Sequence, residues 1–166
     1  MRQEWKTGLA LFSACLALAL LAGAAHFSAV SPPVLRISDW KTGEVYVEYP
    51  VSIGDELYFG LIHSLEKIPW DEYYHIDEDL NLILDTIRFP AFGAGIPEDK
   101  GAVCYIKDGL IYMSEINEKF TGFDWMNSQI YTQEIRVAGK YVTRGSELPH
   151  QRRLVLAIKR RHFFGR

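Results

Sequence analysis

The stretch Glu44-Val45-Tyr46-Val47-Glu48-Tyr49 decides the fold class, because its residue types recur with a period of two. That period is typical of a β-strand, in which successive side chains point to opposite faces. Lys41-Thr42-Gly43 stands directly before it and supplies a turn, and a second apolar run, residues 34–37, precedes the turn. We therefore expect these two runs to pair as a β-hairpin.

The same pattern continues along the chain. Further strands are expected at residues 57–63, 72–76, 80–89, 102–106, 110–114, 133–137, 141–143 and 153–159. Lys107-Asp108-Gly109 and Ala138-Gly139-Lys140 are typical hairpin connections. Residues 117–130 have weak periodicity and are expected to form a long loop or one short helix. Many short strands at close spacing predict an all-β fold, an antiparallel β-sandwich or partly open barrel.

The N-terminus differs in character from the rest of the chain. Residues 8–34 carry no charged side chain, and Arg2 and Lys6 precede the apolar core. Residues 1–30 are therefore expected to be a hydrophobic helix that acts as a signal peptide, cleaved after Ala24, or as a retained signal anchor. Both alternatives place the β domain, residues 34–166, in the periplasm or at the outer face of the inner membrane, after a linker at residues 31–33. A retained N-terminus would be cytoplasmic.

Charge is distributed unevenly along the exported part. Residues 26–144 hold ten lysines or arginines and nineteen aspartates or glutamates, a net charge of −9, whereas residues 145–166 have a net charge of +5. An acidic body argues against a nucleic-acid partner, which requires a concentrated basic face. The basic tail either meets anionic lipid headgroups or an acidic partner, or complements the acidic body.

The two cysteines exclude an internal disulfide in the exported domain, since Cys15 lies within the N-terminal segment. Cys104, between Val103 and Tyr105 in a predicted strand, is expected to be a buried small hydrophobic residue. The fold must then be stabilised by its apolar core.

One compact polar motif stands out, His63-Ser64-Leu65-Glu66-Lys67-Ile68-Pro69, with Glu72 close behind. Pro69 cannot donate to a strand ladder, so the strand is expected to end near Glu66 or Lys67 and the motif to lie at a sheet rim. Two interpretations stay open. The motif is a binding site, in which Lys67 pairs with an anionic group and His63 is oriented by a carboxylate, or it is a satisfied network that fixes the turn.

A second motif is Phe92-Gly93-Ala94-Gly95-Ile96-Pro97. Its two glycines permit positive φ, and their N–H groups suit an anion-holding nest or a tight turn beneath a packed strand. The candidate binding residues from both motifs are His63, Ser64, Glu66, Lys67, Glu72, Gly93 and Gly95.

Metal and catalytic sites are not expected. The pairs His63 with Glu66 and His75 with Asp77 offer too few ligands for zinc. Residues 77–81 open like a calcium loop, but Leu82 stands where the turn needs glycine, so a solvated acidic turn is predicted. His63 and Ser64 point to opposite faces of a strand and no G-x-S-x-G motif is present, so we predict no enzyme activity and no cofactor.

The two motifs in this order resemble the bacterial family known as domain of unknown function 1850. With Gly54-Asp55-x-Leu57 upstream and the basic strand downstream, the resemblance extends over residues 34–159. It implies a small exported or membrane-anchored protein that accompanies a TRAP transporter of the TAXI type, a class that takes up organic acids and amino acids with a periplasmic binding protein.

Three functions follow as alternatives. The first is a non-catalytic extracytoplasmic accessory protein that contacts TRAP-type transporter subunits, permease or binding protein, through the polar rim. The second is a free periplasmic domain that binds a small carboxylate ligand or a cation at the same rim. The third, an enzyme, is the least supported because the sequence contains no complete catalytic set of residues.

Overall fold

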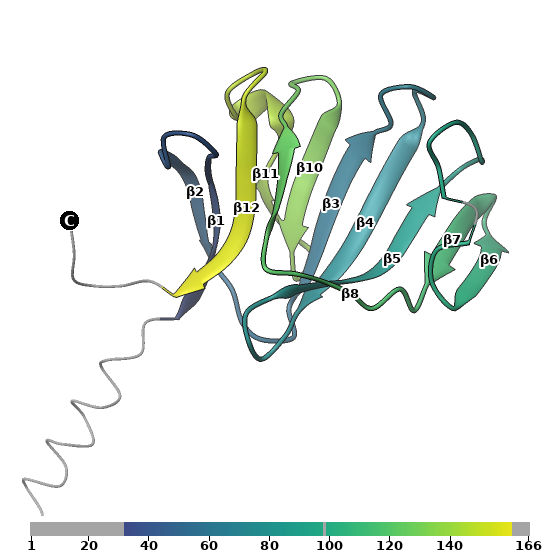
Figure 1. The fold of residues 1–166 in the computed structure, drawn as a ribbon, viewed down its shortest axis with the longest axis horizontal. Coiled ribbons are helices and arrows are strands. Elements are labelled where there is room, and N and C mark those ends of the chain that lie inside the picture. The colour runs from purple at the N-terminus through teal and green to yellow at the C-terminus, as the bar shows by residue number, and fades with distance from the viewer. Residues whose placement is uncertain (1–31, 98, 161–166) are drawn as a thin grey trace, which may run out of the picture. The chain divides into compact units, whose positions relative to one another are not determined.

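The predicted N-terminal hairpin is present in the computed structural model, which describes residues 32–97 and 99–160. β1 (Pro33–Asp39) and β2 (Val45–Pro50) pair antiparallel, with Ile37 opposite Val47. β12 (Arg153–Arg160) pairs with the other edge of β1, as Figure 1 shows. β9 (Phe123–Met126) pairs with β12, so the smaller sheet has the order β2-β1-β12-β9. Its inward side chains, such as Leu35 and Leu156, are fully buried.

The larger sheet has eight strands in the order β11-β10-β3-β4-β5-β7-β6, with β8 beside β5. Its elements are β3 (Glu56–Ile62), β4 (Pro69–Ile76), β5 (Leu82–Phe89), β6 (Val103–Lys107), β7 (Leu110–Ser114), β8 (Glu118–Phe120), β10 (Thr132–Val137) and β11 (Lys140–Thr143). A 3₁₀ turn, η1 (Gly145–Glu147), leads back towards β12. All strand pairs in both sheets are antiparallel, which confirms the predicted all-β, antiparallel character of the fold.

Two of the predicted hairpin connections are confirmed in detail. Asp108 and Gly109 join β6 to β7, and Ala138 and Gly139 join β10 to β11, with positive φ at all four residues. Positive φ at both central residues defines the type I′ turn, whose twist matches that of the flanking strands. These turns set the register of both hairpins.

One hydrophobic core joins the two sheets in a sandwich-like arrangement. It includes Leu57, Phe59 and Ile135 from the larger sheet and Ile37 and Leu154 from the smaller one. Aromatic side chains make the contact between the sheets, because Phe59 of β3 packs edge-on against both Phe123 and Trp125 of β9, at 5.3 Å between ring centroids in each case. Such contacts hold the sheets together without a disulfide.

The expectation of a loop or helix at residues 117–130 is wrong for two segments. Residues 118–120 form β8 in the larger sheet and residues 123–126 form β9 in the smaller one, so the chain crosses between sheets at Thr121-Gly122. Gly122 has φ of +147°, and a Cβ there would lie 2.8 Å from the Leu156 carbonyl oxygen. The strands are short, and each pairs with a distant segment, so local periodicity gives a weak signal.

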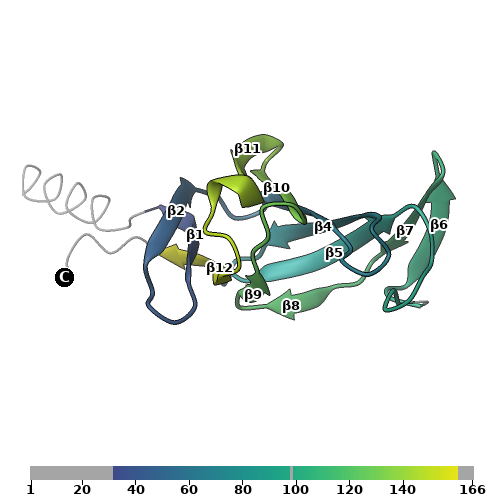
Figure 2. The same cartoon turned by 90° about the horizontal axis from the view of Figure 1, so that it is seen from above.

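The prediction that Cys104 is buried is also wrong, since its side chain is exposed. β6 is the edge strand of the larger sheet, and all five of its residues are exposed. Figure 2 shows β6 and β7 at the end of the sheet far from β1 and β12. The smaller sheet does not cover this end. β6 therefore buries neither face, whereas β7 still buries Ile111 and Met113 on one face.

The expected N-terminal helix, residues 1–30, and Ser31 of the linker lie outside the described residues. Within the part that the structure describes, no helix has the length and apolar character needed to cross a bilayer.

Candidate functional site

The first predicted motif forms the turn between β3 and β4. The His63 N–H donates to the Ile68 carbonyl at 2.8 Å, and the Lys67 N–H donates to the His63 carbonyl at 2.8 Å. The strand therefore ends at Ile62, earlier than Glu66 or Lys67, because His63 already closes the turn. Pro69 opens β4 opposite Ile62, a position at which its missing N–H is tolerated.

The turn contains backbone strain at Lys67, whose φ of +59° lies in the left-handed region. A residue with a side chain adopts this region at a cost of roughly 1 kcal/mol. The same backbone conformation lets the Lys67 ammonium reach the Ser64 carbonyl and the Tyr131 hydroxyl, the latter at 2.6 Å.

The second predicted motif, residues 92–97, contacts this turn directly. Glu66 Oε1 accepts a hydrogen bond from the Ala94 N–H at 2.8 Å. A Cβ on Gly93 would lie 2.6 Å from Glu66 Cδ, so the absent side chain makes room for the glutamate. Gly95 has φ of +79°, and a Cβ there would lie 3.8 Å from His63 Nε2. The structure thus brings together His63, Glu66, Gly93 and Gly95.

His63 is held by the turn itself. Its Nδ1 accepts a hydrogen bond from the Glu66 N–H at 3.3 Å, so in the neutral ring the proton resides on Nε2. The backbone of Glu66, rather than a carboxylate, therefore orients the imidazole. The centroid of the imidazole ring also lies 5.9 Å from that of the Trp70 ring, which stacks on Phe89.

Glu72 lies apart from the turn, in the middle of β4. Its two carboxylate oxygens accept hydrogen bonds from Trp70 Nε1 at 2.9 Å and from the Tyr74 hydroxyl at 2.6 Å. Burial, with the neighbouring Glu72 charge, raises the pKa of Tyr74. Among the residues that the structure describes, Glu72 is thus linked to His63 only through the Trp70 ring, and its carboxylate holds two aromatic side chains on the face that packs against the core.

An open pocket lies at the end of the sandwich beside His63, where β3 meets β9 and the loop before β10. We call it the end pocket; its volume is about 400 Å³. Its apolar lining comes from Phe59, Leu61, Ile62, Trp125 and Met126. His63, Ser64, Ser128, Tyr131 and Thr132 supply the polar lining. Trp125 Nε1 is buried and has no hydrogen-bond partner among the described residues.

A second surface, on the uncovered face of the larger sheet, escaped the sequence analysis. Asp71 accepts hydrogen bonds from Arg88 Nη2 at 2.6 Å and from the Tyr58 hydroxyl at 2.7 Å. The Arg88 guanidinium also lies 5.4 Å from the Tyr73 ring and 5.9 Å from the Tyr112 ring. Burial, together with Asp71, raises the pKa of Tyr58.

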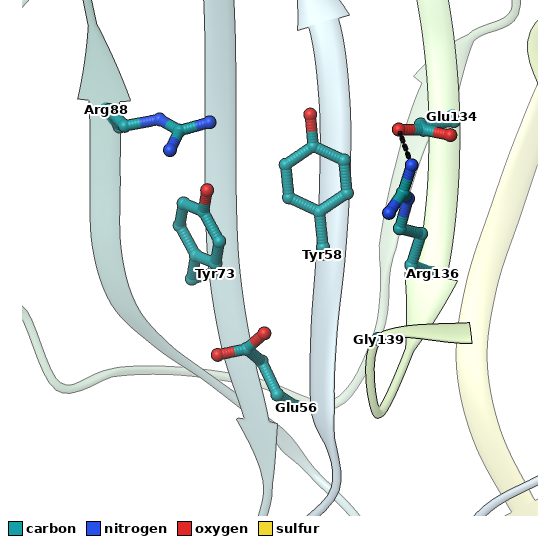
Figure 3. A pocket seen from close by; sticks show the side chains of 7 residues that line it. All are labelled: Glu56, Tyr58, Tyr73, Arg88, Glu134, Arg136 and Gly139. Atoms are coloured by element: carbon teal, nitrogen blue, oxygen red, sulfur yellow. Dashed lines mark ion pairs between the residues drawn. The ribbon is translucent and has the colours of Figure 1, made fainter. Parts of the chain in front are cut away.

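A depression of about 290 Å³ lies on this face. Figure 3 shows Tyr58 and Tyr73 side by side on neighbouring strands, with Arg88 next to Tyr73 and the Glu134–Arg136 ion pair on the opposite side, next to Tyr58. These residues stand at alternate positions of β3, β4, β5 and β10. Only the strand register brings them together, and local sequence does not reveal it.

The residues considered for metal binding have other partners. His75 Nδ1 lies 2.7 Å from Asp85 Oδ2. Asp77 accepts hydrogen bonds from the Asp79 and Asn81 N–H groups and pairs with Lys119 at 3.2 Å. The predicted acidic turn is therefore held by its own backbone and by one lysine. Within residues 32–97 and 99–160, no group of three or more His, Cys, Asp or Glu is arranged to hold a metal ion.

The fold and these sites define a class: an all-β protein of two antiparallel sheets, in which the polar β3–β4 turn and a glycine-containing loop, residues 92–97, contact each other. The chain belongs to the family described as domain of unknown function (DUF1850), whose model matches residues 57–143. The match runs from β3 to β11 and includes every strand of the larger sheet, whereas β1, β2 and β12 lie outside it. No curated protein and no solved structure shows significant similarity to this chain.

Proposed function

We propose that this protein is a non-catalytic extracytoplasmic accessory protein of a solute transporter. In this proposal the rim formed by the β3–β4 turn and residues 92–97 contacts the permease or its binding protein. The choice of a TAXI-type TRAP transporter follows from the expectation attached to the family resemblance.

The observation that carries the proposal is the pair of exposed apolar side chains on the interlocked rim. Leu65 is 65% exposed and Phe92 is 52% exposed, and they stand one on each motif. Large exposed hydrophobic side chains within a polar rim are typical of protein interfaces. The Phe92 ring is also anchored, since it packs edge-on against Phe89 at 5.5 Å.

The hydrogen bond from Ala94 to Glu66 explains why such a rim suits recognition. It joins two loops that are 28 positions apart in the sequence, and Gly93 lets them approach closely. A contact surface that is ordered before binding loses less conformational entropy when a partner docks. In this proposal the motif residues Glu66, Gly93 and Gly95 build the surface, while Leu65 and Phe92 make the contact.

Recovery of transporter subunits with the tagged full-length chain from its native membranes tests the proposal. We expect the variants Leu65→Ser and Phe92→Ser to lower that recovery at least tenfold while the circular dichroism spectrum stays unchanged. Ile53→Ser is the matched control, because Ile53 is 55% exposed but lies in the turn between β2 and β3. Equal recovery with all three variants, or no transporter subunit with the wild-type chain, would contradict the proposal.

A further inference from the structure

The end pocket beside His63 combines features that the proposed partner contact does not use. Its wall is apolar on both sides, with Leu61 and Ile62 from β3 and with Trp125 and Met126 from β9. A volume of about 400 Å³ lies within the range of roughly 300 to 1,000 Å³ typical of small-molecule sites. The pocket therefore suits an apolar group of modest size.

A cation stands at the rim of the same pocket. The Lys67 ammonium donates to the Tyr131 hydroxyl at 2.6 Å and to the Ser64 carbonyl, and both Tyr131 and Ser64 line the pocket. These acceptors are uncharged, and no carboxylate among the described residues pairs with this ammonium. The basic group is thus held near the pocket by two of the lining residues, and it has no carboxylate partner among residues 32–97 and 99–160.

The strained backbone at Lys67 supports a functional interpretation of this placement. A φ of +59° is favoured by glycine or asparagine, yet the position holds a lysine whose side chain points to the pocket rim. Strain of this kind clusters at binding sites, where the surrounding structure holds a residue in an otherwise disfavoured conformation.

We propose that the end pocket binds an apolar monocarboxylate, with the hydrocarbon part between β3 and β9 and the carboxylate at Lys67. The ligand carboxylate would accept a charge-assisted hydrogen bond from the Lys67 ammonium and would supply a negative charge beside it. Burial of the chain would supply most of the affinity, roughly fourfold for each added methylene group. Ser64 and His63, which also line the pocket, would lie beside the carboxylate.

Titration of the intact chain with octanoate, octanol and octylamine tests this site, with heat of binding as the measurement. We expect octanoate to bind at least tenfold more tightly than octanol, octylamine to bind most weakly, and hexanoate to bind roughly sixteenfold more weakly than octanoate. Lys67→Met should reduce octanoate affinity to that of octanol and leave octanol affinity unchanged. Lys41→Met, an exposed lysine in the turn between β1 and β2, is the control.

Quenching of tryptophan fluorescence by 8-bromooctanoate locates the ligand. The quenching should fall strongly in Trp125→Phe, leaving the smaller part that arises from Trp70 near His63. It should be unchanged in Trp40→Phe, because Trp40 lies in the β1–β2 turn outside the pocket lining. Should Lys67→Met fail to fold, Tyr131→Phe removes one of the groups that hold the ammonium and should lower octanoate affinity severalfold.

Absence of octanoate binding by the wild-type chain, equal affinity for octanoate and octylamine, or quenching that is undiminished in Trp125→Phe would overturn the site. The result is separable from that for the proposed transporter contact, because Leu65→Ser tests the partner surface and leaves the pocket lining intact.

Discussion

The Glu66 side chain occupies the space that a side chain at Gly93 would need, since a Cβ on Gly93 would lie 2.6 Å from Glu66 Cδ. The neighbouring Ala94 N–H donates to the same carboxylate at 2.8 Å. One glycine and one glutamate from separate motifs thus form a single structural unit. The Glu66 side chain needs the space that glycine leaves at position 93, so the two residues support each other structurally, whatever the rim binds.

Gly93→Ala should therefore destabilise the protein by about 1 to 2 kcal/mol, because the new Cβ pushes the Glu66 carboxylate away from Ala94. In the Glu66→Ala background the same change should cost less than about 0.5 kcal/mol, since no carboxylate remains to be displaced. Urea unfolding of the four chains gives the coupling energy. Equal costs in both backgrounds would show that the two side chains act independently.

Gly122→Ala should be among the most damaging glycine substitutions. The residue combines φ of +147° with a position where a Cβ would lie 2.8 Å from both the Leu156 oxygen and Ala157 Cβ. The close contact involves β12 backbone, which cannot yield without disturbing the smaller sheet, so we expect a loss of roughly 2 to 4 kcal/mol. Gly139→Ala is the control. Its φ is also positive at +73°, but nothing lies within 4 Å, and it should cost about 1 kcal/mol.

Removal of the Arg88 charge tests the network on the uncovered sheet face. The Asp71 side chain is only 12% exposed and the Arg88 side chain 28% exposed, so Arg88→Met leaves a largely desolvated carboxylate with only the Tyr58 hydroxyl. We expect a loss of about 1 to 3 kcal/mol in the free energy of unfolding, below the figure for fully buried pairs because water still reaches the guanidinium.

Arg136→Met, on the same face, supplies the comparison for the Arg88 variant. Its pair with Glu134 is more exposed, 45% and 31% for the two side chains, and exposed pairs contribute less than about 1 kcal/mol. Similar losses of unfolding free energy in Arg88→Met and Arg136→Met would show that the burial of Asp71 does not make its ion pair the stronger one.

The Asp77 turn predicts how stability depends on pH. Hydrogen bonds from the backbone and side chain of Asn81, with the Lys119 charge, lower the pKa of Asp77 from 3.8 to about 2. A lowered pKa in the folded state stabilises the fold at pH values above about 4, and this contribution is lost as the pH falls towards 2. Asp77→Asn should therefore unfold at lower urea concentration than wild type at pH 6, and the difference should shrink by pH 2.

Glu78→Gln is the control for this pH series, because Glu78 is an exposed neighbour in the same turn. A constant difference between wild type and Asp77→Asn from pH 6 to pH 2 would rule out the titration of Asp77 as its cause.

The sequence predicted those parts of the fold that depend on local pattern. The hairpin of β1 and β2, the type I′ turns and the strand spacing all follow from period two and from turn residues close to each other in the chain. β8 and β9 could not be predicted in this way, because strands of three and four residues show little periodicity and because their partners, β5 and β12, are distant in sequence.

The candidate site divides in the same way. The first motif was recognisable as a polar segment at a sheet rim and the second by its two glycines, but the contact of Glu66 with Ala94 depends on how β5 places the following loop. Glu72 was grouped with His63 by proximity in sequence, whereas the pleat of β4 turns it towards Trp70 and Tyr74. The pairing of Asp71 with Arg88 needs the register of β4 and β5, which no single segment encodes.

The exposed Cys104 on β6 offers a direct test of how the larger sheet ends. Exposed edge strands with unpaired backbone groups are sites of strand addition and are usually covered or protected. β6 has neither proline nor a short length to protect it, and Ile106 beside Cys104 is 74% exposed. In a Cys15→Ser chain, we expect Cys104 to react with a maleimide within minutes in native buffer, at a rate close to that in urea. A rate at least a hundredfold slower than in urea would show that another segment or a second copy covers this edge.

Labelling of Cys104 in the wild-type protein in its native membranes extends the test. Protection of Cys104 in the membranes, with reactivity after purification, would place a partner on β6. Equal reactivity of Cys104 in both preparations would leave the rim at Leu65 and Phe92 as the contact surface.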